Sequence, residues 1–182
     1  MRKHRIAAAA LLGYIVACSP SISMACGYHD DVTLARGMLN WTYPDALHLV
    51  GAMAQAVSEK RLPPPARTLD LWAYHRTVRS LEQLGEQLRI PAGENAPLAF
   101  SLLLIEPMLW TRFNAEGGDL HAQVHVSAPP VGELVLITGE DVVREIANHR
   151  LSVSDAYRQG LIRLYGPETE IARFLQLYCG CA

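Results

Sequence analysis

The last third of the chain, residues 132–178, carries the pattern that most limits what the protein can fold into. Leu134–Ile137 is a short apolar run, partly β-branched, of the kind that forms a strand. Directly after it comes Thr138, with Asp141 three residues later, a spacing typical of a helix start. We therefore predict a strand followed by a helix that begins near Gly139.

The same start signal recurs further along. Ser152 and Asp155 repeat the spacing, and Gly160 is a residue at which a short helix can end in the left-handed conformation. Residues 161–165 then predict a strand, and Pro167 suits the first position of a closing helix. Apolar residues of that helix recur at helical spacing, namely Ile171, Phe174, Leu175 and Tyr178. The predicted order is strand, helix, short helix, strand, helix.

These spacings resemble the C-terminal half of the sterol carrier protein domain. The positions that match are Leu151, Ser152, Ala156, Gly160, Ile162, Leu164 and Gly166. The resemblance covers residues 97–178. It implies a lipid-binding α+β fold in which helices cover one side of a five-stranded sheet and leave an apolar tunnel.

Length and charge narrow the function classes. The chain has 182 residues, half of them hydrophobic, which predicts one domain with a real core plus an extension. A formal charge of −2 and a sequence pI near 6.4 give no basic surface for nucleic acid. We therefore expect no nucleic-acid partner.

The N-terminus has the layout of a secretory signal peptide, residues 1–25. A basic start precedes an apolar run that is shorter than the roughly 20 residues of a membrane span, and small residues precede a cut after Ala25. An alternative is lipidation at Cys18, because Ile15–Cys18 resembles a bacterial lipoprotein box. The first option predicts a periplasmic or extracellular protein, and the second a membrane-anchored lipoprotein.

Export would permit disulfides, and three cysteines remain after a cut at Ala25: Cys26, Cys179 and Cys181. One interpretation is a single bridge from Cys26 to Cys179 or Cys181. The other is a copper or zinc site made by Cys26, His29, Cys179 and Cys181, since thiolate and imidazole ligands suit both metals. Either option requires the two ends of the chain to meet.

The first part of the mature chain, residues 26–96, predicts a helical front. Residues 28–43 show no sustained period and predict a strap anchored by Trp41 and Tyr43. A helix running to about Lys60 should bury a stripe of small and apolar residues, namely Leu47, Val50, Gly51, Ala54 and Val57. A second long helix over 68–89 should pair with it. Its periodic residues are Leu69, Trp72, Val78, Leu81, Leu84 and Leu88.

Residues 97–182 predict the sheet. Leu98–Ile105 is apolar on both faces, as in a central strand covered on two sides, and Glu106-Pro107 ends it. Residues 108–127 predict a hairpin around Gly117-Gly118, with clean alternation after the turn. The expected fold is α+β, with a mostly antiparallel sheet covered by helices and a two-helix N-terminal subdomain in front.

Catalytic signatures are absent from the sequence. It contains no Gly-x-Ser-x-Gly elbow, no phosphate loop, no His-Glu-x-x-His and no Cys-x-x-Cys, so we expect no enzyme and no cofactor. Apolar residues that line either a solid core or a ligand-binding hollow are Phe100, Leu102, Trp110, Val135, Ile137, Ile146, Leu161 and Phe174.

The expected function is therefore non-catalytic binding of a lipid or other hydrophobic molecule by an exported protein. Metal binding by the terminal Cys and His residues is the first alternative. The second is a protein-interaction scaffold, in which the helical front presents Trp41, Tyr43 and Trp72 to a partner.

Overall fold

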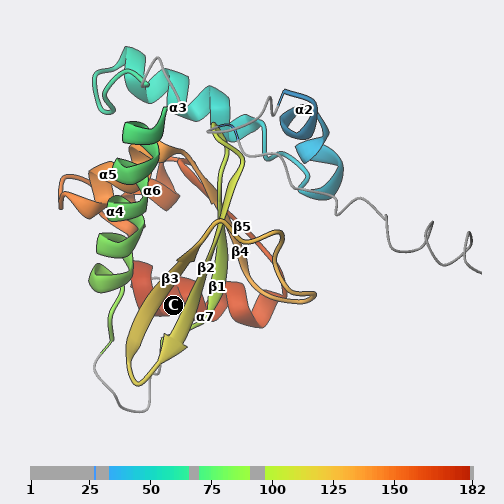
Figure 1. Cartoon of the computed structure of the whole chain (residues 1–182), viewed down its shortest axis with the longest axis vertical. Helices are drawn as coiled ribbons and strands as arrows, with labels where there is room; N and C mark the ends of the chain where they lie inside the picture. Colours follow the sequence, from blue (N-terminus) through green and yellow to red (C-terminus); the bar gives the residue numbers. More distant parts are fainter. Residues whose placement is uncertain (1–26, 28–32, 66–69, 91–96, 181–182) are drawn as a thin grey trace, which may run out of the picture.

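The computed structural model describes residues 27, 33–65, 70–90 and 97–180, and it shows an α+β protein built on one five-stranded sheet (Figure 1). The strands lie in the order β3-β2-β1-β4-β5. Their bounds are β1 Phe100–Leu104, β2 Leu109–Glu116, β3 Asp119–Val124, β4 Val135–Thr138 and β5 Ile162–Tyr165. The predicted fold class is confirmed.

Three of the four strand pairings are antiparallel, and β1 pairs with β4 in parallel. The predicted hairpin is present as β2 and β3, and Gly117 and Gly118 form its turn with positive φ angles of 60° and 100°. Glycine adopts such angles at little steric cost. The parallel pair was not predicted, and it determines where the candidate site lies.

The central strand β1 is buried on both faces, as its sequence predicted. Phe100 and Leu102 belong to one buried cluster, and Leu103 and Ile105 belong to another. Because successive side chains of a strand point to opposite faces, these two clusters lie on opposite sides of the sheet. The molecule therefore has two apolar layers around β1.

Four helices cover the first face: α4 Leu71–Gln87, α5 Glu140–Ala147, α6 Val153–Arg158 and α7 Glu168–Cys179 (Figure 1). The predicted cap of α6 is present, because Ser152 Oγ accepts a hydrogen bond from the Asp155 amide at 2.9 Å. Helix α4 packs along α5 and against β3. Its main partners are therefore α5 and β3. The sequence predicted that it would pair with the preceding helix instead.

Helices α2, Thr33–Thr42, and α3, His48–Ser58, lie across the end of the sheet (Figure 1). Leu39 of α2 and Leu49 of α3 belong to the second buried cluster, and Ala56 of α3 belongs to the first. The prediction of an irregular strap over residues 28–43 is wrong for Thr33–Thr42, which is helical. Tyr43 is an anchor as predicted, with its ring 6.1 Å from Trp110 and 5.1 Å from Tyr165. Trp41 is not an anchor, because it is 87% exposed.

The buried side of α3 differs from the predicted one. Leu49 and Ala56 are fully buried, whereas Val50 is 42% exposed and Ala54 is also exposed. Almost every side chain of this helix is small or apolar, so the sequence contained two candidate apolar faces. The face that carries Leu49 is the one that packs into the core. The stripe predicted to be buried is therefore largely open.

Several predictions fall on residues that the structure does not describe. They are the signal peptide, lipidation at Cys18, and the roles of Cys26, His29 and Cys181. The division of the chain into a front part and a sheet part after residue 96 also stays a prediction. Over the described ranges, no helix combines the length and apolar character that crossing a membrane requires.

Candidate functional site

The candidate site lies where the parallel strands β1 and β4 end. Since parallel neighbours run in the same direction, their carboxyl ends reach the same edge of the sheet. The amide of Ile105 donates to the carbonyl of Thr138 at 3.0 Å, which fixes the two ends side by side. Glu106 follows β1 and Gly139 follows β4, so an acidic residue is placed against the start of α5.

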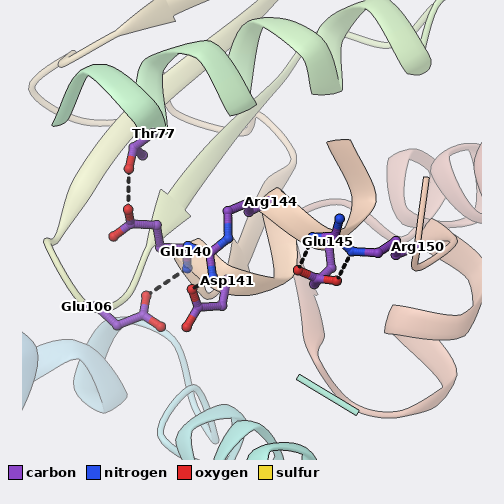
Figure 2. A network of polar contacts seen from close by, with 7 residues as sticks. All are labelled: Thr77, Glu106, Glu140, Asp141, Arg144, Glu145 and Arg150. Atoms are coloured by element: carbon purple, nitrogen blue, oxygen red, sulfur yellow. Dashed lines mark hydrogen bonds and ion pairs between the residues drawn. The ribbon is translucent and has the colours of Figure 1, made fainter. Parts of the chain in front are cut away.

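Glu106 caps helix α5. The N-cap residue is Gly139, which has no side chain to offer, and Glu106 Oε2 accepts a hydrogen bond from the Glu140 amide at 2.9 Å (Figure 2). A carboxylate at a helix N-terminus also interacts favourably with the helix dipole. The predicted cap by Thr138 is wrong, because its hydroxyl donates instead to the carbonyl of Leu161 at 2.7 Å.

The ends of two side chains approach Gly139 closely. A Cβ at this position would lie 2.8 Å from Glu106 Oε1 and would overlap the sulfur of Met53 on α3. The absence of a side chain lets Met53 and Glu106 meet above the start of α5. A larger residue would have to displace both.

Two further carboxylates extend from the first turn of α5. Glu140 accepts a hydrogen bond from the Thr77 hydroxyl on α4, and Asp141 forms an ion pair with Arg144 on the same helix (Figure 2). The side chain of Asp141 is mostly buried. Glu106, Glu140 and Asp141 thus form a small acidic network at this edge of the sheet.

Burial changes the ionisation of this network. Desolvation is the main reason why the pKa of Glu106 is raised from 4.5 to about 7, the neighbouring charges of Glu140 and Asp141 add to it, and the bond from the Glu140 amide opposes it. Desolvation also raises the pKa of Asp141, although Arg144 counteracts this. Glu106 therefore changes charge near neutral pH.

Glu106 and Asp141 are the polar residues in the lining of an otherwise apolar groove. The groove has a volume of about 370 Å³ and runs between α3 and the sheet edge. Its lining consists of Val50, Met53, Ala54, Val57, Leu62, Pro65, Glu106 and Asp141. Volumes of about 300 to 1,000 Å³ are usual for small-molecule sites, which are mostly apolar with a few placed polar groups. We call this feature the α3 groove.

The eight residues predicted to line a hollow do not surround one space. Phe100, Leu102, Ile146, Leu161 and Phe174 share the helix-covered face. Trp110, Val135 and Ile137 belong to the opposite face, so the sheet separates them from the first five. The space described beside Leu102, Ile146 and Phe174 amounts to only about 10 Å³. One water molecule needs about that much. No tunnel is seen there, and contact of these residues with a ligand stays a prediction.

Only Cys179 of the proposed metal or disulfide set is described. It lies half-buried at the end of α7, where its carbonyl accepts a hydrogen bond from Ser154 Oγ at 3.2 Å. Within the described residues, no three or more His, Cys, Asp or Glu side chains are arranged to hold a metal ion. The disulfide and the copper or zinc site both stay predictions.

Comparison with known proteins gives similarity of structure only. No protein-family model matches the chain, and no curated protein does. A crystal structure of sterol carrier protein 2 like 2 from Aedes aegypti matches 57% of this chain and 97% of its own, with 17% identity and a TM-score of 0.41. The solution structure of palmitated SCP2L2 from Aedes aegypti matches 56% and 89%, with 17% identity and a TM-score of 0.35.

A third similar structure is the inverting sec-alkylsulfatase Pisa1 from Pseudomonas sp.. It matches 47% of this chain at 16% identity with a TM-score of 0.34, and the chain spans 13% of the length of that enzyme. Sterol carrier proteins, to which the sequence has a resemblance, are thus among the similar structures. We draw no conclusion on function from similarities of this strength.

The sequence patterns predicted neither the position of Glu106 beside α5 nor the open apolar face of α3 that forms the groove. Glu106 was interpreted as the end of a strand, and the parallel pairing that brings it to α5 was not predicted. One signal was available: α3 carries apolar residues at Leu49 and Ala56 and also at Val50, Met53 and Val57. A helix apolar on more than one side has a second surface to cover.

Proposed function

We propose that the protein binds a lipid or another hydrophobic small molecule in the α3 groove, without transforming it chemically. The observation that carries the proposal is the groove itself, a space of about 370 Å³ whose lining is apolar except for Glu106 and Asp141. Burial of apolar ligand surface would contribute about 25 cal/mol per Å² before the costs of ordering are deducted.

The groove supports the proposal better than the interior of the sheet domain. The enclosed space beside Leu102 and Phe174 is about 10 Å³, too little for an acyl chain without rearrangement, and the larger pocket of about 590 Å³ between α4, α6 and α7 is lined by Arg89, Arg150 and Asp155 as well as by apolar residues. The groove is already open, and its wall residues Val50 and Ala54 are exposed to solvent. A ligand there would cover apolar side chains that the described chain leaves uncovered.

We further propose that binding takes place outside the cytoplasm. The support is the basic start, the apolar run and the small residues before Ala25 in the sequence. Intact-mass measurement of protein purified from culture tests this. Loss of residues 1–25 supports export through a cleaved signal peptide, a lipid-modified Cys18 supports an anchored lipoprotein, and an unprocessed chain contradicts both.

The binding proposal is tested by filling the groove. Ala54→Trp places a large side chain in the groove at an exposed position, so the fold should tolerate it. Gln55→Trp is the matched control, because Gln55 is the next residue on α3, is exposed and does not line the groove. The probe is N-phenyl-1-naphthylamine, whose fluorescence rises in apolar surroundings.

Wild-type protein and the Gln55→Trp variant should bind the probe with similar affinity, and the Ala54→Trp variant should bind at least tenfold more weakly. Circular dichroism establishes that all three are folded. Equal binding by all three would place the probe elsewhere and contradict the proposed site. Absence of binding to the wild type would contradict the proposed function.

A further inference from the structure

We propose that the natural ligand of the α3 groove carries a positively charged head group, an amine or a quaternary ammonium, on a hydrocarbon body. This inference rests on the proposed function and specifies the class of ligand for the same groove. The lining of the groove holds two carboxyl groups and no cationic side chain.

The lining is divided sharply between apolar and acidic groups. Six of the eight lining residues are apolar or proline, and the other two are Glu106 and Asp141. None of the eight is Lys or Arg. A molecule with a hydrocarbon body along α3 would therefore have its polar end beside two carboxyl groups.

Glu106 is available to such a head group. None of the ion pairs formed between described residues includes it, although Asp141 is paired with Arg144. The bond from the Glu140 amide occupies one carboxyl oxygen of Glu106, Oε2. The amide of Glu106 itself also donates to this carboxyl, whose negative charge remains able to attract an ammonium group and, where that group carries N–H, to accept a hydrogen bond from it.

The charged groups around Glu106 leave the region acidic. Glu140 and Asp141 stand at the start of α5, and Arg144 follows one turn later. Arg36 on α2 donates to the backbone carbonyls of Ile105 and Glu106. A cation beside Glu106 would favour its ionised form, so its pKa of about 7 should fall when the ligand binds.

An anionic head group would meet the opposite situation. A fatty-acid carboxylate in the same position would lie beside Glu106 and Asp141, and like charges in a partly desolvated site repel. A neutral alcohol would gain a hydrogen bond without this repulsion. The order of affinity at equal chain length should therefore be ammonium, then alcohol, then carboxylate.

The experiment uses the full-length processed protein and three probes with the same eight-carbon chain: octyltrimethylammonium, octanol and octanoate. Affinities are measured at pH 8, where Glu106 is largely ionised, by displacement of N-phenyl-1-naphthylamine from the wild type. Octyltrimethylammonium should displace the probe with at least tenfold higher affinity than octanoate. Its affinity should decrease from pH 8 to pH 6, because Glu106 then takes up a proton.

The charge is tested with Glu106→Gln, which retains an oxygen that can accept from the Glu140 amide. The matched control is Glu59→Gln, which removes one negative charge from the end of α3 outside the groove. Glu106→Gln should reduce the preference for ammonium over carboxylate at least threefold, and Glu59→Gln should leave it unchanged.

The possible results separate failure of the head-group inference from failure of the proposed function. A preference for ammonium that is reduced only by Glu106→Gln supports the inference. Equal or tighter binding of octanol or octanoate to the wild type overturns it while the groove remains the proposed site. If none of the three displaces the probe and the probe itself does not bind, the proposed function fails as well.

Discussion

The space beside the helix-covered side of β1 and the space beside α3 are both lined by apolar residues, but the first is filled by side chains and the second is open. On the side covered by α4 to α7, aromatic rings interlock: Phe100 stacks on Phe113 with centroids 4.7 Å apart, and Phe174 meets Phe100 edge-on at 5.6 Å. Beside α3, at the edge of the sheet, a groove of about 370 Å³ remains open. A second open space of about 590 Å³ lies between α4, α6 and α7, but its lining mixes Arg89, Arg150 and Asp155 with apolar residues, whereas the α3 groove is lined almost wholly by apolar side chains.

The difference shows that apolar content does not indicate where a ligand site is. The rings of Phe100, Phe113 and Phe174 are fully buried between the helices and the sheet. On the groove side, helix α3 presents the small exposed residue Ala54 between Val50 and Val57, and its short side chain leaves space open. Mostly apolar open space is therefore found beside α3.

The largest expected effect comes from Phe174→Ala on the closed side. Phe174 is fully buried among Phe100 and neighbouring apolar residues, and its removal would leave a cavity. The free energy of unfolding should fall by about 3 to 5 kcal/mol. Urea unfolding measures this. A loss below about 1 kcal/mol would show that this side is not packed as described.

Glu106→Gln should change the pH dependence of stability. The folded-state pKa of about 7 exceeds the ordinary 4.5, so the folded protein holds a proton that the unfolded chain releases, and stability falls as pH rises from about 4.5 to 7. This difference between the two pKa values corresponds to a change in the free energy of unfolding of at most about 3 kcal/mol. The variant should lose this dependence.

The comparison is urea unfolding of wild type and Glu106→Gln at pH 5.5 and pH 8. The wild type should lose more stability over this interval than the variant does. The carboxyls of Glu145 and Asp155 have lowered pKa values and titrate below the interval, whereas the raised pKa of Asp141 is present in both proteins, so the difference between them reports on Glu106. Identical pH dependence in the two proteins would contradict the buried ionisable Glu106.

A smaller effect is expected from Ser152→Ala, which removes the side-chain cap of α6. The Asp155 amide would lose its partner, and the free energy of unfolding should fall by about 1 kcal/mol. Ser154→Ala is a useful comparison, because Ser154 bonds the Cys179 carbonyl and does not cap α6. Unchanged stability of the Ser152 variant would show that water replaces the cap.

The smallest effect is expected from Val50→Ala on the open side. Val50 is 42% exposed, so its truncation should cost less than about 0.5 kcal/mol, in contrast to Phe174→Ala. The affinity for N-phenyl-1-naphthylamine should nevertheless fall, because Val50 lines the groove. A stability loss as large as that of Phe174→Ala would mean that the groove is closed in solution.

Local signals predicted most of the sheet domain. The hairpin at Gly117-Gly118, the cap at Ser152 and the central strand are specified by neighbouring residues. The α3 groove depends on two things that local patterns do not contain. One is the parallel pairing of β1 with β4, which joins Glu106 to α5, and the other is the choice of the buried face of α3.

The resemblance to sterol carrier proteins predicted the fold class, and a ligand contact of the eight predicted lining residues stays a prediction. The residues expected to line a hollow are core residues on two faces of one sheet. Whether a motif surrounds a tunnel or a solid core depends on the sizes of side chains that meet across the layers. In this chain Phe100, Phe113 and Phe174 meet and fill that space.

The most direct test of the central claim is methyl-resolved NMR of the protein during titration with octyltrimethylammonium. We predict that the methyl signals of Val50, Met53 and Ala54, which line the α3 groove, shift in a saturable manner, while those of Leu102, Ile146 and Val153 on the closed side do not. Saturable shifts confined to Leu102, Ile146 and Val153 would contradict the account and place the ligand inside the helix-covered layer.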